Sequence, residues 1–220
     1  MAFGIRLHCW GETALFSRPE FKSERVSYDV ITPSAARGVI EAIYWKPQIR
    51  WVIDRLRVLR PIRFTSQRRN EVSGKIPAGA AASAMRAGRG NLGLYVEEQR
   101  QQRAALLLRD VAYVIEAHFD LVGGDDNEAK HLDTFNRRAR AGQAFTRPYF
   151  GTRENAAHFA LLEGDATPVD ELPPDQRNKD LGWMLHDLDF ANDREARFFH
   201  AKMEDGLIHV PPFHSEAVRG

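Results

Sequence analysis

Residues 32–47 read TPSAARGVIEAIYWKP and predict a helix. Thr32 can cap the first free backbone amides. Pro33 costs nothing at the first helical position, because its missing N–H would have no partner there. Apolar residues recur at helical spacing and form one face. Pro47 disfavours helical geometry in the residue before it, so we expect the helix to run up to this proline, with two aromatic residues and a lysine on its last turn.

The three residues on that turn have two interpretations. Tyr44, Trp45 and Lys46 place two aromatic rings and a cation side by side. They could be ordinary core packing, with the lysine stabilising the carboxyl end of the helix dipole. They could also belong to a functional surface, and the helix alone does not distinguish these alternatives.

The segments around this helix have the alternating hydrophobicity of β-strands. We expect four strands, at residues 3–10, 49–59, 106–121 and 158–162, with a loop over 11–31. A second helix is expected over residues 128–140; Asp125 opens it in capping-box register with Glu128, and Gly142 follows as its C-cap. The order strand, helix, strand, strand, helix, strand predicts an α+β, ferredoxin-like (RRM-like) domain, a fold used by RNA recognition modules.

Two further segments flank this framework. Residues 66–105 are rich in Gly, Ala and Arg, cannot build a core of their own, and are expected to form a flexible basic arm. After residue 164 the chain passes through an acidic linker with prolines, and the pair Asp205-Gly206 indicates a hairpin turn. We therefore expect a ferredoxin-like domain over residues 1–164 and a small C-terminal antiparallel β-sheet over residues 165–220.

The composition is typical of a soluble protein with a sizeable core. The chain has 220 residues, of which 43% are hydrophobic and 28% charged. It has no run of 18 apolar residues, and its first residues have a strand pattern without a signal-peptide layout. The single cysteine, Cys9, cannot form an internal disulfide. These features predict a cytoplasmic protein without a membrane span.

The charges are unevenly distributed along the chain. Residues 46–109 contain fourteen Lys or Arg and four Asp or Glu, a local net charge of +10, whereas the whole chain has a net charge of +1. The remaining residues therefore sum to −9. Such segregation favours a polyanion-binding face, and Arg, the commonest of these cations, pairs with phosphate through a planar fork. The alternative is a solvated arginine-rich surface.

The sequence offers one set of residues for metal-free chemistry. No histidine pairs with Cys, Asp or Glu at the spacing of a known metal motif, so we expect no metal and no cofactor. Lys130 and His131 stand in the first turn of the second helix, where free amides favour an anion. A Lys/His/Tyr set can move the protons of RNA cleavage and stabilise the crowded phosphorane. A Lys-His pair at a helix start is also common on ordinary surfaces.

Several segments, taken in order, resemble one family. TPSAARGVIEAIYWKP (32–47), NEAKH (127–131) and PYFGTRE (148–154) are similar to CRISPR-associated protein family five in its type I-C (Dvulg) branch, and the resemblance covers nearly the whole chain. IYWKP and NEAKH are more specific together than either is alone. The family pattern has a cysteine and an aromatic residue where this chain has Thr152 and Asn155.

The resemblance implies an endoribonuclease that processes precursor crRNA. Members of that branch cut the CRISPR repeat without metal, stay bound to the guide 5′ handle, and join a surveillance complex with backbone and large subunits. Their catalytic residues match Tyr44, Lys130 and His131. Attack by the ribose 2′-hydroxyl would leave a 2′,3′-cyclic phosphate and a 5′-hydroxyl. The alternatives are a non-catalytic RNA-binding subunit of that complex and a duplex-DNA binder.

The RNA-binding residues are expected at the ends of both helices, on the arm, and in the loop after the second helix. They are Lys46, Arg68, Arg69, Arg86, Arg89, Arg137, Arg138, Arg140, Gly142 and Arg147.

Overall fold

The computed structural model describes residues 4–21, 24–90, 92–123, 127–164 and 166–220. Its strands are β1 (Gly4–Ala14), β2 (Arg25–Val26), β3 (Ile49–Val58), β4 (Phe64–Val72), β5 (Arg100–Leu121), β6 (His158–Leu161), β7 (Lys179–Asp189), β8 (Glu195–Glu204), β9 (Leu207–His209) and β10 (Val218–Arg219). Its helices are α1 (Pro33–Ile43), α2 (Ala78–Ala87), α3 (Val96–Gln99) and α4 (Glu128–Arg140), with a 3-10 turn η1 (Pro174–Gln176). Within these ranges no helix is long and apolar enough to cross a membrane.

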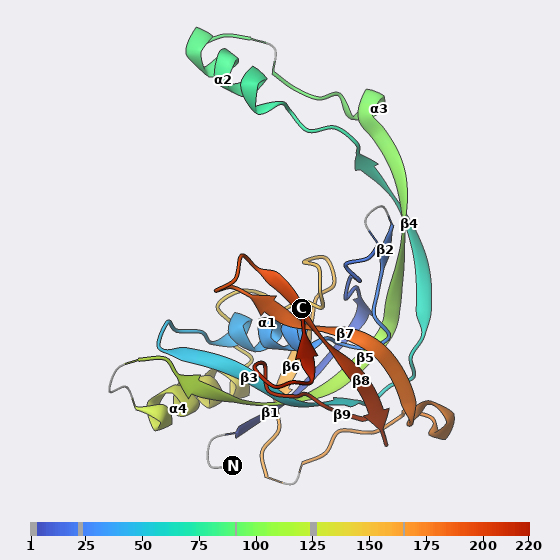
Figure 1. The fold of residues 1–220 in the computed structure, drawn as a ribbon, viewed down its shortest axis with the longest axis vertical. Coiled ribbons are helices and arrows are strands. Elements are labelled where there is room, and N and C mark those ends of the chain that lie inside the picture. Colours follow the sequence, from blue (N-terminus) through green and yellow to red (C-terminus); the bar gives the residue numbers. More distant parts are fainter. Residues whose placement is uncertain (1–3, 22–23, 91, 124–126, 165) are drawn as a thin grey trace.

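The strands form one large, almost entirely antiparallel sheet in the order β10-β8-β9-β3-β5-β1-β6 (Figure 1). The long strand β5 pairs with both β1 and β3, and β4 and the short parallel strand β2 also pair with it. The main core includes Leu7, Leu56 and Ile115 of the three central strands, together with Ile40 of α1 and Phe135 of α4. The mixed α/β fold class is therefore confirmed.

Two strands are longer than expected, and the first loop contains an additional short strand. β1 continues to Ala14, and residues 25–26 form β2 within the segment expected to be a loop. Strand β5 begins at Arg100, six residues before its expected start, because its first half pairs with β4 along the arm. β3 and β6 lie within one residue of their predicted ends.

Helix α1 begins as predicted but ends earlier. Thr32 caps it by accepting a hydrogen bond from the Ala35 amide at 3.3 Å, with Pro33 at the first position. The helix ends at Ile43, and Tyr44 has an extended backbone with φ −153°. The prediction that Tyr44, Trp45 and Lys46 form its last turn was therefore wrong. Pro47 sets only the latest residue at which the helix could end. Hydrogen bonds from other segments to the carbonyls of residues 42–44 end it sooner.

Helix α4 has the predicted extent. Asn127 caps it by accepting a hydrogen bond from the Ala129 amide at 2.9 Å, whereas Asp125, the expected cap, lies outside the described residues. At the other end Gly142 has φ +64°, its amide donates to Ala139, and the Gln143 amide donates to Arg138. These two bonds form a Schellman motif, so the predicted glycine stop is confirmed.

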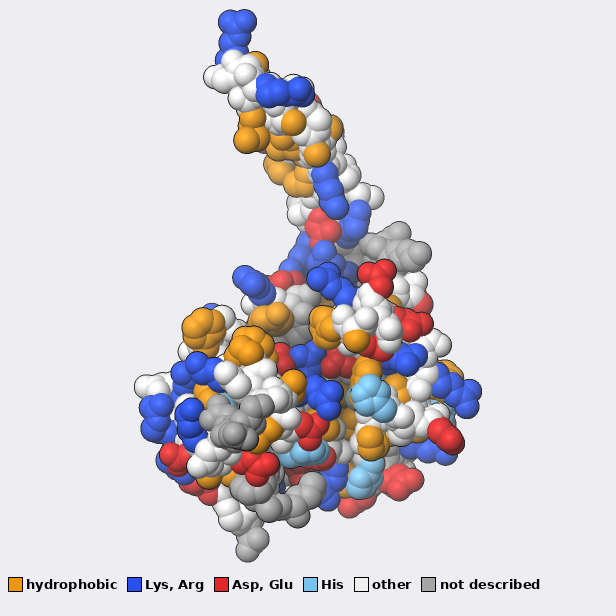
Figure 2. Space-filling model, turned by 60° about the vertical axis from the view of Figure 1, so that its left-hand side comes forward, with side chains coloured by type: hydrophobic (Ala, Val, Ile, Leu, Met, Phe, Trp, Pro, Cys, Tyr) orange, Lys and Arg blue, Asp and Glu red, His pale blue; other side chains and the backbone are white. Residues whose placement is uncertain are grey.

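The expected arm is present as a hairpin that projects from the body (Figure 1). β4 and the first half of β5 form its stem, and α2 and α3 lie beyond the stem. Neither of these helices buries a residue. Lys and Arg side chains are spread along this projection, whereas the body mixes both signs of charge (Figure 2).

The C-terminal strands extend the main sheet. β7 and β8 form a hairpin, and β8 turns into β9 through Asp205 and Gly206, at φ 48° and 74°, as the sequence predicts. β9 then pairs with β3. The small sheet expected over residues 165–220 is therefore continuous with the first one.

Gly151 is required where the loop after α4 meets the end of β1. It has φ +81°, and a Cβ there would lie 1.9 Å from the Leu15 carbonyl oxygen. The Leu15 amide donates to the Phe150 carbonyl at 3.1 Å, so the two backbones cannot separate without losing this bond.

We expect Gly151→Ala to lower the free energy of unfolding by more than about 2 kcal/mol, because a left-handed residue with a Cβ already costs roughly 1–2 kcal/mol before the clash is added. Urea denaturation measures this. The matched control is Gly38→Ala in α1, where a Cβ meets nothing within 4 Å; that change should stabilise the protein by up to about 1 kcal/mol. Equal effects at both positions would contradict the prediction.

Candidate active site

The last carbonyl groups of α1 receive hydrogen bonds from three distant segments. The Ala42 carbonyl accepts from the Phe145 amide at 2.8 Å and from the Thr146 amide at 3.2 Å. The next carbonyl, of Ile43, accepts from a side chain of α4, and that of Tyr44 accepts from the Trp51 indole at 2.9 Å. Since these carbonyls have no partner inside the helix, the three segments together fix where α1 ends.

Tyr44 and His131 form the centre of the candidate site. The Tyr44 hydroxyl lies 2.8 Å from His131 Nδ1, and the two rings are tilted with centroids 5.9 Å apart. Phe119 presents an edge contact to the His131 ring. Tyr44 is 3% exposed and His131 is 2% exposed. The end of α1 and the start of α4 thus bring together two groups that are 87 positions apart in the sequence.

Arg138 supports Tyr44 from α4. Its guanidinium donates to the Ile43 carbonyl at 3.0 Å and lies 5.2 Å from the centre of the Tyr44 ring. A cation over an aromatic face is attractive, and it holds the ring in place. The sequence placed Arg138 among the RNA-binding residues; the structure turns it toward Tyr44, while its neighbour Arg137 is exposed.

Lys130 is exposed on the first turn of α4, one residue before His131. This end of the helix presents backbone amides and the positive end of the dipole. An anion bound there would have an ammonium group beside it. The site therefore combines a phenol, an imidazole and a cation, the groups needed to move protons around a phosphate and to stabilise its charge.

Exposed aromatic and basic side chains lie at the same helix end. Trp45 is 54% exposed, Lys46 follows it, and Phe145 is 83% exposed. Arg147 is exposed on the loop whose amides reach Ala42. Aromatic faces and cations together are suited to unpaired RNA, in which bases stack and phosphates need neutralisation.

The remaining predicted cations lie elsewhere. Arg68 of β4, Arg86 of α2 and Arg89 after α2 are exposed. The outer part of the arm that carries α2 projects away from α1 and α4 (Figure 1). Arg69 pairs with Glu154 at 2.7 Å. Arg140, at the end of α4, pairs with Glu163. The structure thus gathers Lys46, Arg138, Gly142 and Arg147 near Tyr44 and separates the arm cations from them.

The described part of this site lacks a set of metal ligands. Among the described residues no group of three or more His, Cys, Asp or Glu side chains could hold a metal ion. The described part of the site therefore offers proton-transfer groups and a cation, and no ligand set.

The comparisons with known proteins identify the family. A model of the Cas5d family, described as CRISPR-associated protein (Cas_Cas5), matches residues 4–211. A protein of Mannheimia succiniciproducens is 53% identical over 100% of both chains. The chain belongs to the Cas5d family of CRISPR-associated proteins. A Thermus thermophilus relative is 41% identical over 94% of this chain and 91% of its own, and both relatives are named CRISPR pre-crRNA endoribonuclease Cas5d.

Solved structures share the fold of this Cas5d chain at lower identity. The crystal structure of a CRISPR-associated protein is 22% identical with a TM-score of 0.70, covering 99% of this chain and 96% of that one. A functionally uncharacterized protein of Streptococcus mutans, also 22% identical, has a TM-score of 0.67 and covers 99% and 97%. These likenesses support the fold alone.

The buried contact between Tyr44 and His131 should contribute to stability. We expect Tyr44→Phe to lower the free energy of unfolding by roughly 1–3 kcal/mol, because it removes the partner of a buried polar atom while leaving the ring in place. Chemical denaturation followed by circular dichroism measures this. The matched control is Tyr149→Phe, since Tyr149 is 39% exposed and should lose less than about 0.5 kcal/mol. Equal losses at both positions would contradict the coupling of Tyr44 to His131.

Proposed function

We propose that this chain is a metal-independent endoribonuclease that cleaves the repeat RNA of a CRISPR precursor transcript. The observation that carries the proposal is the 2.8 Å contact between the Tyr44 hydroxyl and His131 Nδ1, with Lys130 exposed beside it. This contact lies in a chain that is 53% identical over its full length to a protein named as a pre-crRNA endoribonuclease.

In the proposed reaction the nucleophile comes from the RNA. The ribose 2′-hydroxyl is held next to the scissile phosphorus, so no water has to be positioned. The 2′-oxygen loses its proton and bonds to phosphorus, and the bond from phosphorus to the 5′-oxygen breaks as that oxygen gains a proton. The products are a 2′,3′-cyclic phosphate and a 5′-hydroxyl.

Tyr44 and His131 share the two proton transfers. If the Tyr44 hydroxyl donates to Nδ1, the imidazole carries its proton on Nε2 and can give it to the leaving oxygen while Nδ1 takes the proton of Tyr44, so that the ring stays neutral. If Nδ1 donates to the hydroxyl, Nε2 has the lone pair of a base. The direction of the hydrogen bond with Tyr44 is thus tied to the tautomer of His131, and with it to the role of Nε2 as acid or base. Lys130 stabilises the charge on the phosphorane.

RNA must gain access to these groups, because both side chains are almost fully buried. We infer that the residues covering them shift when RNA binds, since catalytic contacts in free enzymes commonly tighten only in the complex. Trp45, Lys46, Phe145 and Arg147 would then engage the nucleotides around the scissile phosphate. Gly142 allows the turn that brings this loop to the end of α1.

The proposed architecture is a ferredoxin-like domain over residues 1–164, with a C-terminal β extension over residues 165–220. The neighbouring strands β3-β5-β1-β6, with α1 and α4 as crossovers, support it. The arm cations Arg68, Arg69, Arg86 and Arg89, and Arg137 and Arg140 of α4, are proposed to bind RNA. The chain then keeps the guide 5′ handle within a surveillance complex that contains backbone and large subunits.

The mechanism predicts a separation of cleavage from binding. His131→Ala should slow cleavage of cognate repeat RNA by on the order of 10²- to 10⁴-fold, the usual cost of losing a positioned acid or base. Repeat affinity should change little, because distant cations carry it. Single-turnover kinetics and filter binding measure the two effects. His158→Ala, an exposed histidine on β6, is the control and should cleave normally.

The chemistry itself is tested with the RNA. A repeat with a single 2′-deoxyribose 5′ of the scissile phosphate should bind and stay intact, and the all-ribose repeat should be cut in EDTA to a 2′,3′-cyclic phosphate end. Cleavage of the deoxy substrate, or loss of cleavage in EDTA, overturns the mechanism. Tight repeat binding with no cleavage at any site would favour the non-catalytic subunit, and preferential binding of duplex DNA would favour the DNA binder.

The arm makes a prediction about affinity. Replacing Arg68, Arg86 and Arg89 by Gln should weaken repeat binding and reduce its dependence on salt, because each lost phosphate contact releases one fewer counterion. Titrations at several salt concentrations measure the slope. The control replaces the three exposed arginines Arg153, Arg194 and Arg219, which lie outside the arm. An unchanged affinity and slope in the arm variant would mean that the arm does not face RNA.

A further inference from the structure

A concave site lies on the body, beside Trp45. It is a cavity of about 630 Å³ between α1, the beginning of β3, the turn from β7 to β8, and residues 210–214. Trp45, Trp51, Phe190 and Phe213 form apolar walls. Phe190 is 65% exposed, and Trp45 is more than half exposed. Large exposed aromatic side chains around an apolar hollow are typical of a binding site and cost solubility if left uncovered.

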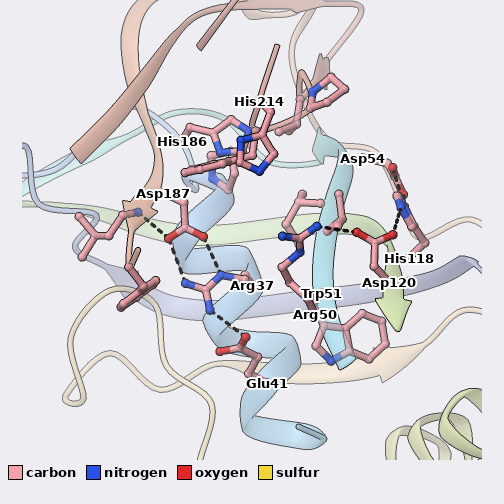
Figure 3. A pocket seen from close by; sticks show the side chains of 18 of the residues that line it. Arg37, Glu41, Arg50, Trp51, Asp54, His118, Asp120, His186, Asp187 and His214 are labelled. Carbon is pink, nitrogen blue, oxygen red and sulfur yellow. Dashed lines mark hydrogen bonds and ion pairs between the residues drawn. The ribbon is translucent and has the colours of Figure 1, made fainter. Parts of the chain in front are cut away.

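One side of this cavity carries a partly buried charge cluster with a negative excess. Arg37 donates to both carboxylate oxygens of Asp187, at 2.7 and 2.9 Å, and to Glu41 at 2.7 Å (Figure 3). Burial alone would lower the pKa of Arg37, but the hydrogen bonds and charges of Asp187 and Glu41 outweigh it and raise the pKa. The single positive charge of Arg37 is thus shared between two carboxylates, which leaves one negative charge unbalanced.

A second charged cluster lies on β3 and β5, on the side of the cavity away from Arg37 (Figure 3). His118 Nδ1 lies 2.9 Å from both oxygens of Asp54, and Arg50 donates to Asp120 at 2.9 Å. Even if the His118 ring were charged, it and Arg50 would only balance the carboxylates of Asp54 and Asp120, so this cluster has no net positive charge. In total the cavity is lined by five carboxylates and two guanidiniums. The fifth carboxylate, Asp189, also pairs with Arg197 outside the lining, and the other four still outnumber the two guanidiniums.

The cavity also contains a buried acceptor. His186 is 8% exposed, and its Nε2 lies 2.8 Å from the Pro211 carbonyl oxygen, to which it must donate. Nδ1 is then an acceptor, and it is buried without a hydrogen-bond partner among the described residues. Burial lowers the pKa of His186 and so favours the neutral ring. The Pro211 carbonyl and Asp187 act in the opposite direction and have the smaller effect. Such an atom is costly unless a donor reaches it.

These features select a ligand with cationic donors and an apolar part. Phosphate would meet a net negative lining, so a nucleic acid backbone is disfavoured, and the basic arm already offers it a better surface. A guanidinium or ammonium would be attracted by the carboxylates and could stack on Phe190. An adjoining apolar side chain would fill the hollow, as aromatic and arginine anchors do at protein interfaces.

We propose that this cavity is a docking site for a polypeptide segment of a partner subunit that carries an arginine or lysine beside an apolar side chain. The inference rests on the proposed function only in that the chain acts within a complex of several proteins. Trp51 lines the cavity and packs against Phe135, whereas Phe135, Tyr44 and His131 are not among the lining residues. Docking and cleavage can therefore be altered separately.

The test places a photoreactive p-benzoylphenylalanine at Phe190 in the complex purified with the protein subunits encoded beside this chain and with guide RNA. Irradiation should cross-link the photoreactive residue at position 190 to a protein subunit. Mass spectrometry should locate the cross-link in that subunit next to an Arg or Lys. The same group at Val169, which is 79% exposed outside the cavity, is the control and should give no such product. A bond to guide RNA, to a second copy of this chain or to an acidic segment, or no bond at all, overturns the proposal.

Charge is tested by a conservative pair of changes. Glu41→Gln with Asp120→Asn removes two negative charges from the lining and should weaken association with the partner subunits by roughly tenfold. The control pair Asp175→Asn with Glu216→Gln removes two exposed charges outside the cavity and should leave association unchanged. Both variants should cleave repeat RNA at the wild-type rate. Unchanged association of the Glu41→Gln, Asp120→Asn variant overturns the docking proposal. If the wild-type protein itself does not cleave repeat RNA, the proposed function is overturned instead.

Discussion

The structure depends on how the last carbonyl groups of α1 are satisfied. A helix leaves these groups without partners, and here the donors come from the loop after α4, from Arg138 of α4 and from Trp51 of β3. Each donor belongs to a different part of the fold, so the end of α1 is fixed only when all of them are packed. The chain then leaves the helix in an extended conformation at Tyr44, which directs the phenol toward His131. The geometry of the candidate site is thus a consequence of helix capping.

Local signals made much of the fold predictable from the sequence. Thr32 with Pro33 marks the start of α1, alternating hydrophobicity marks β3, and Gly142 marks the end of α4. Each of these signals depends only on residues that are close together in the sequence. The end of α1 could not be predicted in this way. The donors that end it lie as far away as Phe145, about a hundred positions along the chain, and no local pattern reports them.

The candidate site was predictable in part. Tyr44, Lys130 and His131 were matched through the family resemblance, and the structure brings Tyr44 and His131 together. Arg138 was grouped with the basic end of α4, although its helical spacing held the better signal: it stands three residues after buried Phe135 and seven after His131, on the same face. The docking cavity had no such signal, because Arg37 and Asp187 are 150 positions apart.

Thr152 and Asn155, which depart from the family pattern, form one connected polar unit. Asn155 is 2% exposed; its amide group donates to the Thr152 hydroxyl at 2.7 Å and its side-chain oxygen accepts from Thr13 of β1 at 2.5 Å. The Asn155 carbonyl accepts from the Phe150 amide at 2.7 Å. An asparagine without these partners would leave a buried amide unsatisfied, at a cost of about 1–3 kcal/mol. These partners tie the loop to β1, and the same loop supplies the amides that end α1.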